Sequence, residues 1–345
     1  MSKNGAGLSV KASADFFVVG SSTLDIIAKT SDIERIDIAG KHVEHLVCIS
    51  FASKSELESL ELSPGGSASN SAIMMRTLGS SVYLLSAVGN DEFGKIVLAD
   101  LKKNGINTAA VKVFGSSPTG VGLNILSSGG EKSILVYRGA NSSLGPSEVS
   151  EFAVKNAKRV FIASLVSAKN YEVFRKVLAL TKKHGKPVVF APSITMLHSW
   201  MPELKKSKPY FDIVIMNYEE GRYYTGIDDI KSILDSLPGK IAVVTKDTEG
   251  AYAAEKSGKN SKNVKYFHVS AVPMNIRDTT GAGDAFSGAF AHTYHSTHSI
   301  TEALKTAAAA AALKLVHKGA HFSLSKAALT GFMSRNSLKL VVRRF

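Results

Sequence analysis

The chain of 345 residues contains a single cysteine, Cys48, and one tryptophan. With one thiol, no internal disulfide can form, and this favours a reducing compartment. No apolar run approaches the length of a membrane span, and the first fourteen residues contain no signal-peptide core. We therefore expect a cytoplasmic protein with no membrane partner, in which Cys48 is a buried, inert residue of a strand.

Acidic residues are also few. The chain has 29 Asp and Glu against 42 Lys and Arg, a formal net charge of +13. Such an excess fits a nucleic-acid-binding protein or one that handles anionic phosphates. The basic residues are spread along the chain, and we find no nucleic-acid-binding motif. We predict no specific nucleic-acid partner, and RNA binding driven by charge stays an alternative that uniform salt dependence would mark as nonspecific.

Hydrophobic residues make up 44% of the chain, as in ordinary soluble proteins. A first strand is expected at 16–20, and from about residue 146 helices and strands alternate regularly. The later strands are predicted at 159–163, 187–191, 212–216 and 240–245, with a hairpin at 250–255 and 265–269. This alternation predicts an α/β fold whose mostly parallel central sheet carries helices on both faces.

Two early β segments, 43–51 and 121–137, do not fit the alternation. The second contains two strand-like runs around Ser127-Ser128-Gly129-Gly130, which is typical of a hairpin. The stretch between residues 20 and 43 is polar and contains Asp and Lys. We predict that the two segments form a small separate β-sheet, a lid over the functional site.

The most informative stretch is Asp278-Thr279-Thr280-Gly281-Ala282-Gly283-Asp284. It places two glycines at a predicted helix N-terminus, where free backbone N–H groups and the helix dipole favour an anion. A carboxylate follows at Asp284. An anion site beside a potential base is what phosphoryl transfer to a hydroxyl needs. The alternative is an ordinary turn and helix cap.

Two further patterns lie near the N-terminus. Gly65 and Gly66 open a predicted helix that carries Asn70; small residues allow a ligand close to the backbone, and the amide is both donor and acceptor. Asp25 follows the first strand, and ligands of open α/β sheets bind beyond the carboxyl ends of strands. Its carboxylate can accept hydrogen bonds from two adjacent hydroxyls. The alternatives are a loop, a turn and a cap.

Two more patterns follow later strands. Asn217 and Glu220 come directly after strand 212–216 and, three residues apart, share one face of a helix. An Asn and a Glu can hold a magnesium ion through its water shell, although such pairs are also common on surface helices. Thr245 and Lys246, then Gly250, stand at the end of strand 240–245.

In this order the motifs resemble the ribokinase/PfkB family of carbohydrate and nucleoside kinases. The resemblance spans about residues 16 to 320 and includes two family signatures: the Gly-Gly-x-x-x-Asn segment that continues to Gly94, and the box at 278–284. It implies a ribokinase-like fold with a kinase domain at 16–333 and lid segments near 26–62 and 112–140. Residues 1–15 would then be an N-terminal extension and 334–345 a C-terminal tail.

The resemblance also implies roles around the phosphates. The turn of Gly281, Ala282 and Gly283 would form the anion hole for the transferred phosphoryl group, and Asp284 would be the base. Asn217 and Glu220 would position Mg2+ and its waters. The residues along the nucleotide would be Thr245, Lys246, Gly250 and Thr279. ATP and Mg2+ are thus the expected cofactors, with a monovalent cation as a further candidate.

For the acceptor, the resemblance implies contacts from the residues Asp25, Gly65, Gly66, Asn70 and Asn141. Arg138 either meets an acidic or phosphorylated substrate or merely flanks the lid. The lid is also the expected dimer contact, so we expect a homodimer. The chain departs from the family pattern in segment 189–193, where family members often have an acidic residue or Asn. Here Ala191 is apolar and only Ser193 can form side-chain hydrogen bonds within 191–193.

Two alternatives to a sugar kinase are considered. A nucleoside kinase on the same fold would stack lid side chains on a base, and Ile49, Phe51 and Leu123 do not decide between acceptors. A non-catalytic sugar- or nucleotide-binding regulator is disfavoured by the intact box at 278–284.

Histidines 292, 295 and 298 follow the box at three-residue spacing. They either bind a metal or, as we prefer, lie on a partly exposed helix face.

Overall fold

The computed structural model describes residues 13–32, 34–38, 44–48, 54–127, 132–257, 263–319 and 324–345. Its described residues form a nine-stranded main sheet. Across that sheet the strands are β17 (Val342–Arg344), β16 (Asn263–Val269), β15 (Gly250–Ser257), β14 (Ile241–Lys246), β13 (Ile213–Asn217), β12 (Val188–Phe190), β11 (Ala157–Ile162), β1 (Ala14–Val19) and β6 (Val82–Leu85). The six strands from β14 to β6 are parallel, and β15, β16 and β17 add antiparallel pairs.

Strand β1 shows why helices cover both faces of this sheet. Successive side chains of a strand point to opposite faces. Phe16 and Val18 are fully buried in one hydrophobic core, and Phe17 and Val19 are buried in the other. Such two-sided burial is typical of a parallel sheet, and it confirms the predicted α/β architecture.

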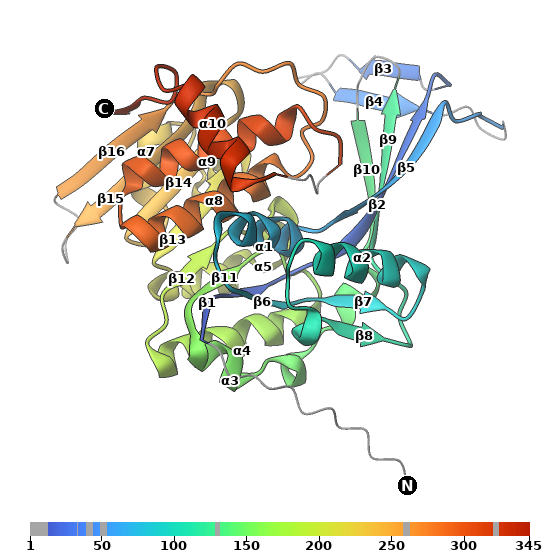
Figure 1. Ribbon diagram of the computed structural model, residues 1–345, viewed down its shortest axis with the longest axis horizontal. Coiled ribbons are helices and arrows are strands. Elements are labelled where there is room, and N and C mark those ends of the chain that lie inside the picture. Colours follow the sequence, from blue (N-terminus) through green and yellow to red (C-terminus); the bar gives the residue numbers. More distant parts are fainter. Residues whose placement is uncertain are drawn as a thin grey trace, which may run out of the picture.

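The helices divide between these two cores (Figure 1). The first core contains α1 (Ser67–Leu78), α2 (Glu92–Lys103), α8 (Ala282–Thr297), α9 (Ile300–Leu315) and α10 (Lys326–Arg335). The second contains α3 (Glu151–Asn156), α4 (Ala168–His184), α5 (Ile194–Lys206), α6 (Tyr218–Thr225) and α7 (Ile230–Ser236). Short 3-10 turns are η1 (Thr108–Ala110), η2 (Gly139–Ser143), η3 (Pro146–Glu148), η4 (Lys208–Tyr210) and η5 (Asp247–Glu249). Among the described residues, no helix is both long and apolar enough to cross a membrane.

A second, four-stranded sheet, here called the lid sheet, projects from the main body beside α2 (Figure 1). Its strands, in order, are β10 (Lys132–Tyr137), β9 (Val121–Ser127), β2 (Thr23–Thr30) and β5 (Ser59–Gly65). Two separate ribbons pair β3 (Glu34–Ile38) with β4 (Glu44–Cys48) and β7 (Ala87–Gly89) with β8 (Lys112–Phe114). The expected small separate sheet is therefore present.

The composition of the lid sheet differs from the sequence-based expectation. Strand β2 occupies residues 23–30, a stretch that we described as polar and that lies only in part within the expected lid segment near 26–62. Segment 43–51 contributes β4 to the ribbon with β3 and not to the lid sheet. Residues 43 and 49–51, with Ile49 and Phe51, lie outside the described residues. We predicted no strand there, although polar and apolar residues alternate along much of β2, which is typical of a half-buried strand. Cys48 is half-exposed, so the prediction that it is buried was wrong.

Two other elements differ in detail. Residues 82–89 form two strands: β6 and β7 are divided at Ser86 and belong to different sheets. Residues 334–345, expected as a C-terminal tail, include β17, which pairs with β16 at the edge of the main sheet. The hairpin expected at 250–255 and 265–269 is present as β15 and β16.

Close packing of α8 on α1 yields a stability prediction. A Cβ at Gly288 would lie 2.6 Å from the carbonyl oxygen of Ser71 and 3.1 Å from Met74 Cβ. We expect Gly288→Ala to lower the free energy of unfolding by about 1–3 kcal/mol, because the two helices must separate. Chemical denaturation measures this change.

Gly331→Ala in α10 is the matched control. Its Cβ would lie 3.4 Å from Arg335 Nη1, the end of a flexible side chain. Alanine is the better helix former, so this variant should be neutral or gain up to about 1 kcal/mol. Equal effects of the two substitutions would contradict the packing argument.

Candidate active site

The N-terminus of helix α8 is open. Gly281 precedes the helix with φ of 78°, a left-handed conformation that favours glycine. The Ala282 amide donates to the carbonyl oxygen of the exposed Thr279 at 3.2 Å. Within the described residues no side chain caps this helix, and a Cβ at Gly283 would meet no atom within 4 Å. The predicted helix start is confirmed, and its backbone N–H groups can receive an anion.

Asp284 lies in the first turn of α8, where Asn70 of α1 holds its carboxylate. Asn70 Nδ2 donates to Asp284 Oδ2 at 2.6 Å, and Ser71 Oγ donates to the Asp284 carbonyl oxygen at 3.2 Å. Asn70 Oδ1 is buried and has no hydrogen-bond partner in the part of the chain that the structure describes. Buried polar atoms are rarely left unsatisfied, so this oxygen marks a place for a donor from a ligand.

Burial and, to a smaller extent, the negative charge of Asp25 raise the pKa of Asp284 to about 7. The hydrogen bond from Asn70 acts in the opposite direction, because it stabilises the charged form. The carboxyl group is therefore balanced between its protonated and ionised forms near neutral pH. A group with such a pKa can accept a proton and release it again.

The carboxylate of Asp25 comes from the lid sheet and fits between two glycines. Asp25 on β2 pairs directly with Gly122 on β9. A Cβ would lie 2.6 Å from Asp25 Oδ1 at Gly122 and 2.7 Å from Oδ2 at Gly65. The absence of side chains at both positions makes room for the carboxylate, and Thr23 Oγ1 donates to Oδ1 at 3.5 Å. Asp25, Asn70 and Asp284 thus form one site from three distant segments.

Two expected acceptor contacts have a clear structural role. Gly66 has φ of 101°, and a Cβ there would lie 2.5 Å from the Ser21 carbonyl oxygen. The side chain of Asn141 binds the backbone of Ser22 at both ends: Oδ1 accepts from the amide at 3.0 Å, and Nδ2 donates to the carbonyl oxygen at 2.7 Å. Both residues fix the turn between β1 and β2, which carries Asp25.

Arg138 lines a pocket of about 70 Å3 next to this turn, together with Asn141 and the hydroxyl-bearing Ser21, Thr23 and Ser164. Burial lowers the pKa of its guanidinium. No carboxylate of the described residues forms an ion pair with it. A half-buried cation in a pocket of neutral polar groups fits a ligand that carries negative charge or several hydroxyls.

The nucleotide residues expected at the strand ends lie beside the expected magnesium residues. Asn217 at the end of β13 pairs with Thr245 near the end of β14. The Lys246 ammonium lies 2.8 Å from Glu249 Oε1, which raises the pKa of Lys246. Gly250 has φ of 99°, and a Cβ there would collide with the backbone at Val269. The turn between β14 and β15 therefore requires this glycine for the fold itself.

Asn217 and Glu220 form a reciprocal cap at the start of α6. Asn217 Oδ1 accepts from the Glu220 amide, and Glu220 Oε2 accepts from the Asn217 amide, both at 2.8 Å. Burial, and to a smaller extent the charge of Asp284, raises the pKa of Glu220 to about 7. No group of three or more His, Cys, Asp or Glu within the described ranges could enclose a metal.

These residues nevertheless fit Mg2+ held through water. Mg2+ keeps several waters and takes only one or two carboxylates alongside substrate phosphates. The carboxyl group of Glu220, which is disfavoured in its charged form by burial and by Asp284, would be stabilised as a carboxylate by a nearby cation. The donor set therefore suits a hydrated ion and not a protein-enclosed one.

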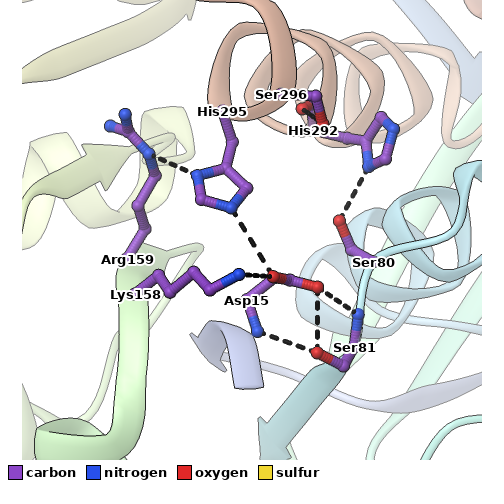
Figure 2. A network of polar contacts seen from close by, with 8 residues as sticks. All are labelled: Asp15, Ser80, Ser81, Lys158, Arg159, His292, His295 and Ser296. Carbon is purple, nitrogen blue, oxygen red and sulfur yellow. Dashed lines mark hydrogen bonds and ion pairs between the residues drawn. The ribbon is translucent and has the colours of Figure 1, made fainter. Parts of the chain in front are cut away.

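The histidines after the box contact the opposite end of the sheet. His292 Nδ1 lies 2.7 Å from Ser80 Oγ, and His295 Nδ1 accepts from Arg159 Nε at 3.0 Å (Figure 2). His295 Nε2 lies 3.6 Å from Asp15 Oδ1. Burial lowers the pKa of His292 to about 4. His298 ends the helix in a left-handed conformation. The side chains of His292 and His295 therefore contribute to packing near the start of β1, and His298 is exposed.

Asn124 is a site residue that sequence reasoning missed. It lies on β9 two residues after Gly122, so it shares the face of the lid sheet that carries Asp25. Its Nδ2 donates to the Gly122 carbonyl oxygen at 3.1 Å, and its Oδ1 is buried without a partner among the described residues. The period-2 alternation of β9 was the signal that could have found it.

Ser193, the polar group of the divergent segment, caps α5 and contacts Ser164 Oγ at 2.6 Å.

An open helix N-terminus with an adjacent carboxylate suits phosphoryl transfer to an alcohol group. The sequence model of the pfkB family of carbohydrate kinases matches residues 17–327. This span covers most of the chain, and the chain belongs to that family. The deoxyribokinase of Salmonella typhi is 28% identical over 317 residues, which cover 90% of this chain and 95% of that protein.

Solved structures share the ribokinase-like fold. The ribokinase of Arabidopsis thaliana, complexed with ribose and ATP, has a TM-score of 0.72 at 26% identity, covering 93% of this chain and 99% of that one. The adenosine kinase of Sinorhizobium meliloti has a TM-score of 0.77 at 22% identity, covering 94% and 100%. A ribokinase-type protein of E. coli in complex with ATP and Mg2+ has a TM-score of 0.74 at 22% identity, covering 93% of this chain and 99% of that one. At 22% identity the last two show the fold alone.

The raised pKa of Asp284 predicts a pH-dependent stability. Between its ordinary value of 3.8 and about 7, the folded protein holds a proton that the unfolded chain has lost, so this group's contribution to stability falls as pH rises. Asp284→Asn mimics the protonated form. Relative to wild type, the variant should gain on the order of 2 kcal/mol of unfolding free energy between pH about 5 and about 8. Urea denaturation at both pH values measures the gain, and a difference independent of pH would contradict it.

Proposed function

We propose that the protein transfers the γ-phosphoryl group of ATP to a hydroxymethyl group of a sugar. Asp284 acts as the base, and the backbone N–H groups at Gly281, Ala282 and Gly283 form the anion hole. The observation that carries this proposal is the position of the Asp284 carboxylate, held by Asn70 at 2.6 Å in the first turn of an uncapped helix. The backbone N–H groups that stabilise the charge and the carboxylate that accepts the proton are thereby within one helical turn.

The chemistry follows from this geometry. A sugar hydroxyl has a pKa far above 7, so Asp284 cannot remove its proton before the reaction begins. As the hydroxyl oxygen bonds to the γ-phosphorus, the bond from phosphorus to the bridging oxygen of ADP breaks, and the hydroxyl proton passes to Asp284. The helix N-terminus stabilises the negative charge on the phosphoryl oxygens.

The acceptor lies between the lid sheet and α1. Asp25 offers two carboxylate oxygens, and Asn70 Oδ1 is a buried acceptor without a partner in the described residues. These atoms accept hydrogen bonds from adjacent hydroxyls, as a sugar provides. Gly65 and Gly66 keep the backbone free of side chains at this point, and Arg138 and Asn141 complete the pocket.

The nucleotide lies beyond the ends of β13 and β14, along Thr245, Lys246, Gly250 and Thr279. Asn217 and Glu220 would hold Mg2+ through its water shell, where the ion would supply positive charge against the phosphate oxygens. Glu220 must be ionised for that role, which its pKa of about 7 permits near neutral pH.

A coupled assay of ADP release tests the function directly. Pentoses, hexoses, sugar acids, sugar phosphates and nucleosides serve as acceptors with ATP. At least one sugar should be turned over, and Asp284→Asn should lower kcat by about 1,000-fold or more while ATP still binds, because the anion site is intact. Calorimetric titration with ATP measures that binding.

The panel also separates the alternatives. Turnover of nucleosides alone would replace the sugar by a nucleoside as acceptor, and no turnover of any compound would favour a non-catalytic regulator. Near-normal kcat of Asp284→Asn would remove this residue from the mechanism. The wild-type protein could prefer an acidic or phosphorylated sugar. If Arg138→Gln abolishes that preference, the guanidinium of Arg138 binds the anionic group of the sugar.

We also propose that two copies of the chain pair through the lid sheet. On the face opposite to Asp25, the residues Leu62, Ile26, Leu123 and Leu135 form a row of directly paired positions across all four strands. Leu62 is 48% exposed and Leu135 is 60% exposed. A continuous apolar sheet face of this kind is typical of an interaction surface, and a second copy offers an equally apolar one.

Leu135→Lys should therefore convert a dimer into a monomer, because two buried charges would meet no partner in the interface. Light scattering coupled to size-exclusion chromatography measures the mass. Val113→Lys, on an exposed strand position outside the lid sheet, is the control and should leave the dimer intact. A wild-type protein that is monomeric at micromolar concentration would contradict the proposal.

A further inference from the structure

Lys314 is a fully buried lysine that the proposed mechanism does not use. It lies in the last turn of α9, and none of its surface is exposed. The preceding turns of the same helix are rich in alanine, which brings neighbouring backbones close. An ammonium group removed from water is costly unless strong acceptors replace its hydration. The identity of those acceptors therefore indicates what the lysine does.

Two backbone carbonyl groups surround the ammonium. Lys314 Nζ donates to the carbonyl oxygen of His317 at 3.0 Å and to that of Asp278 at 3.2 Å. His317 follows the C-terminus of α9, and Asp278 is the first residue of the box at 278–284. The side chain thus connects the end of one helix to the segment that leads into the anion hole.

Other hydrogen bonds show how tightly this junction is built. The amides of Arg277 and Asp278 both donate to the Leu315 carbonyl oxygen, at 2.8 and 3.2 Å. Asp278 Oδ2 accepts from the Gly319 amide at 2.9 Å. Asp278 Oδ1 accepts from the amide and the hydroxyl of Thr280, at 2.9 and 2.7 Å. The ammonium lies within a junction where the start of the box contacts the chain that follows α9.

Carbonyl oxygens at the C-terminus of a helix carry partial negative charge and favour a cation. Here a second carbonyl, from the box, faces the same position. We infer that Lys314 is an internal cation, tethered to the chain, that fixes the box and thereby positions the N–H groups of Gly281 to Gly283. Lys314 is a positioning residue, since its ammonium acts on the anion hole through the backbone of Asp278.

A consequence can be tested on the unmodified protein. Because the cation is part of the chain, turnover should not require a dissolved monovalent cation. Wild-type kcat should agree within about twofold in buffers whose only monovalent cation is K+, Na+ or tetramethylammonium. Activation by K+ or Na+ of tenfold or more over tetramethylammonium would overturn the inference, since it would mean that the chain lacks its own cation.

Two substitutions at one position sharpen the test. Lys314→Ala vacates the space of the ammonium, whereas Lys314→Met fills it with a neutral side chain of similar length. Both should lower kcat by on the order of 100-fold, because a small displacement of the anion hole suffices for such a loss. Only Lys314→Ala should regain at least tenfold with added NH4+ or K+, and tetramethylammonium, which is too large for the space, should restore nothing. Lys305→Ala on the same helix, whose ammonium pairs with Glu302 near the surface at 3.2 Å, should behave as wild type.

The predictions for kcat rest on the proposed function, because they need a turned-over acceptor. Thermal unfolding tests the inference about Lys314 without that assumption. NH4+ or K+, compared with tetramethylammonium, should raise the Tm of Lys314→Ala and leave those of wild type and Lys314→Met unchanged, whether or not an acceptor is known. A Lys314→Ala variant without response to cations in both Tm and kcat would contradict the inference. A variant that folds only when NH4+ or K+ is present would support it.

Discussion

The site depends on one contact, the hydrogen bond from Asn70 Nδ2 to Asp284 Oδ2 at 2.6 Å. It joins α1 and α8, whose paired residues are 214 positions apart in the chain. The contact is possible because Gly288 and the backbone at Ser71 let the two helices approach closely. Once made, it holds a half-buried carboxylate next to an open helix N-terminus. The proposed anion hole and the proposed base are thus placed by the same helix pair.

The lid sheet adds the second constraint, a negative charge close to Asp284. Asp25 reaches its position only because Gly65 and Gly122 lack side chains. Its charge and the burial of Asp284 both favour the protonated form, while Asn70 favours the ionised form. A pKa of about 7 follows from this balance. The raised pKa that lowers the stability of the folded protein at higher pH is therefore the same property that lets Asp284 accept a proton near neutral pH.

Sequence reasoning predicted the main sheet and the box because both rest on local signals. Two-sided apolar strands such as β1 and the glycines of a helix start can be recognised in a few residues. Strand β2 was missed because we weighed its polar residues alone, although their alternation with apolar residues is the signal of a half-buried strand. Asn124 was missed because β9 lies between β10 and β2, and β2 comes from a distant part of the chain.

Side-chain geometry was also beyond the sequence. Asn217 and Glu220 were predicted to share a helix face, and the structure shows that they cap each other as well. Asn141 was expected to face the acceptor, whereas its amide is bound to the backbone of Ser22 while it lines the pocket. The burial of Lys314 could not be predicted, because it depends on the return of the chain after α9 to the start of the box.

The pH dependence of kcat/KM tests the central claim, that Asp284 is a base with a raised pKa. We expect a rise with pH that levels off above about pH 7, since only the ionised carboxylate accepts the proton. Asp25→Asn should move the inflection to lower pH, because it removes a charge that raises the pKa of Asp284. A rate that is constant between pH about 5 and about 8, or an inflection that Asp25→Asn moves to higher pH, would contradict the account.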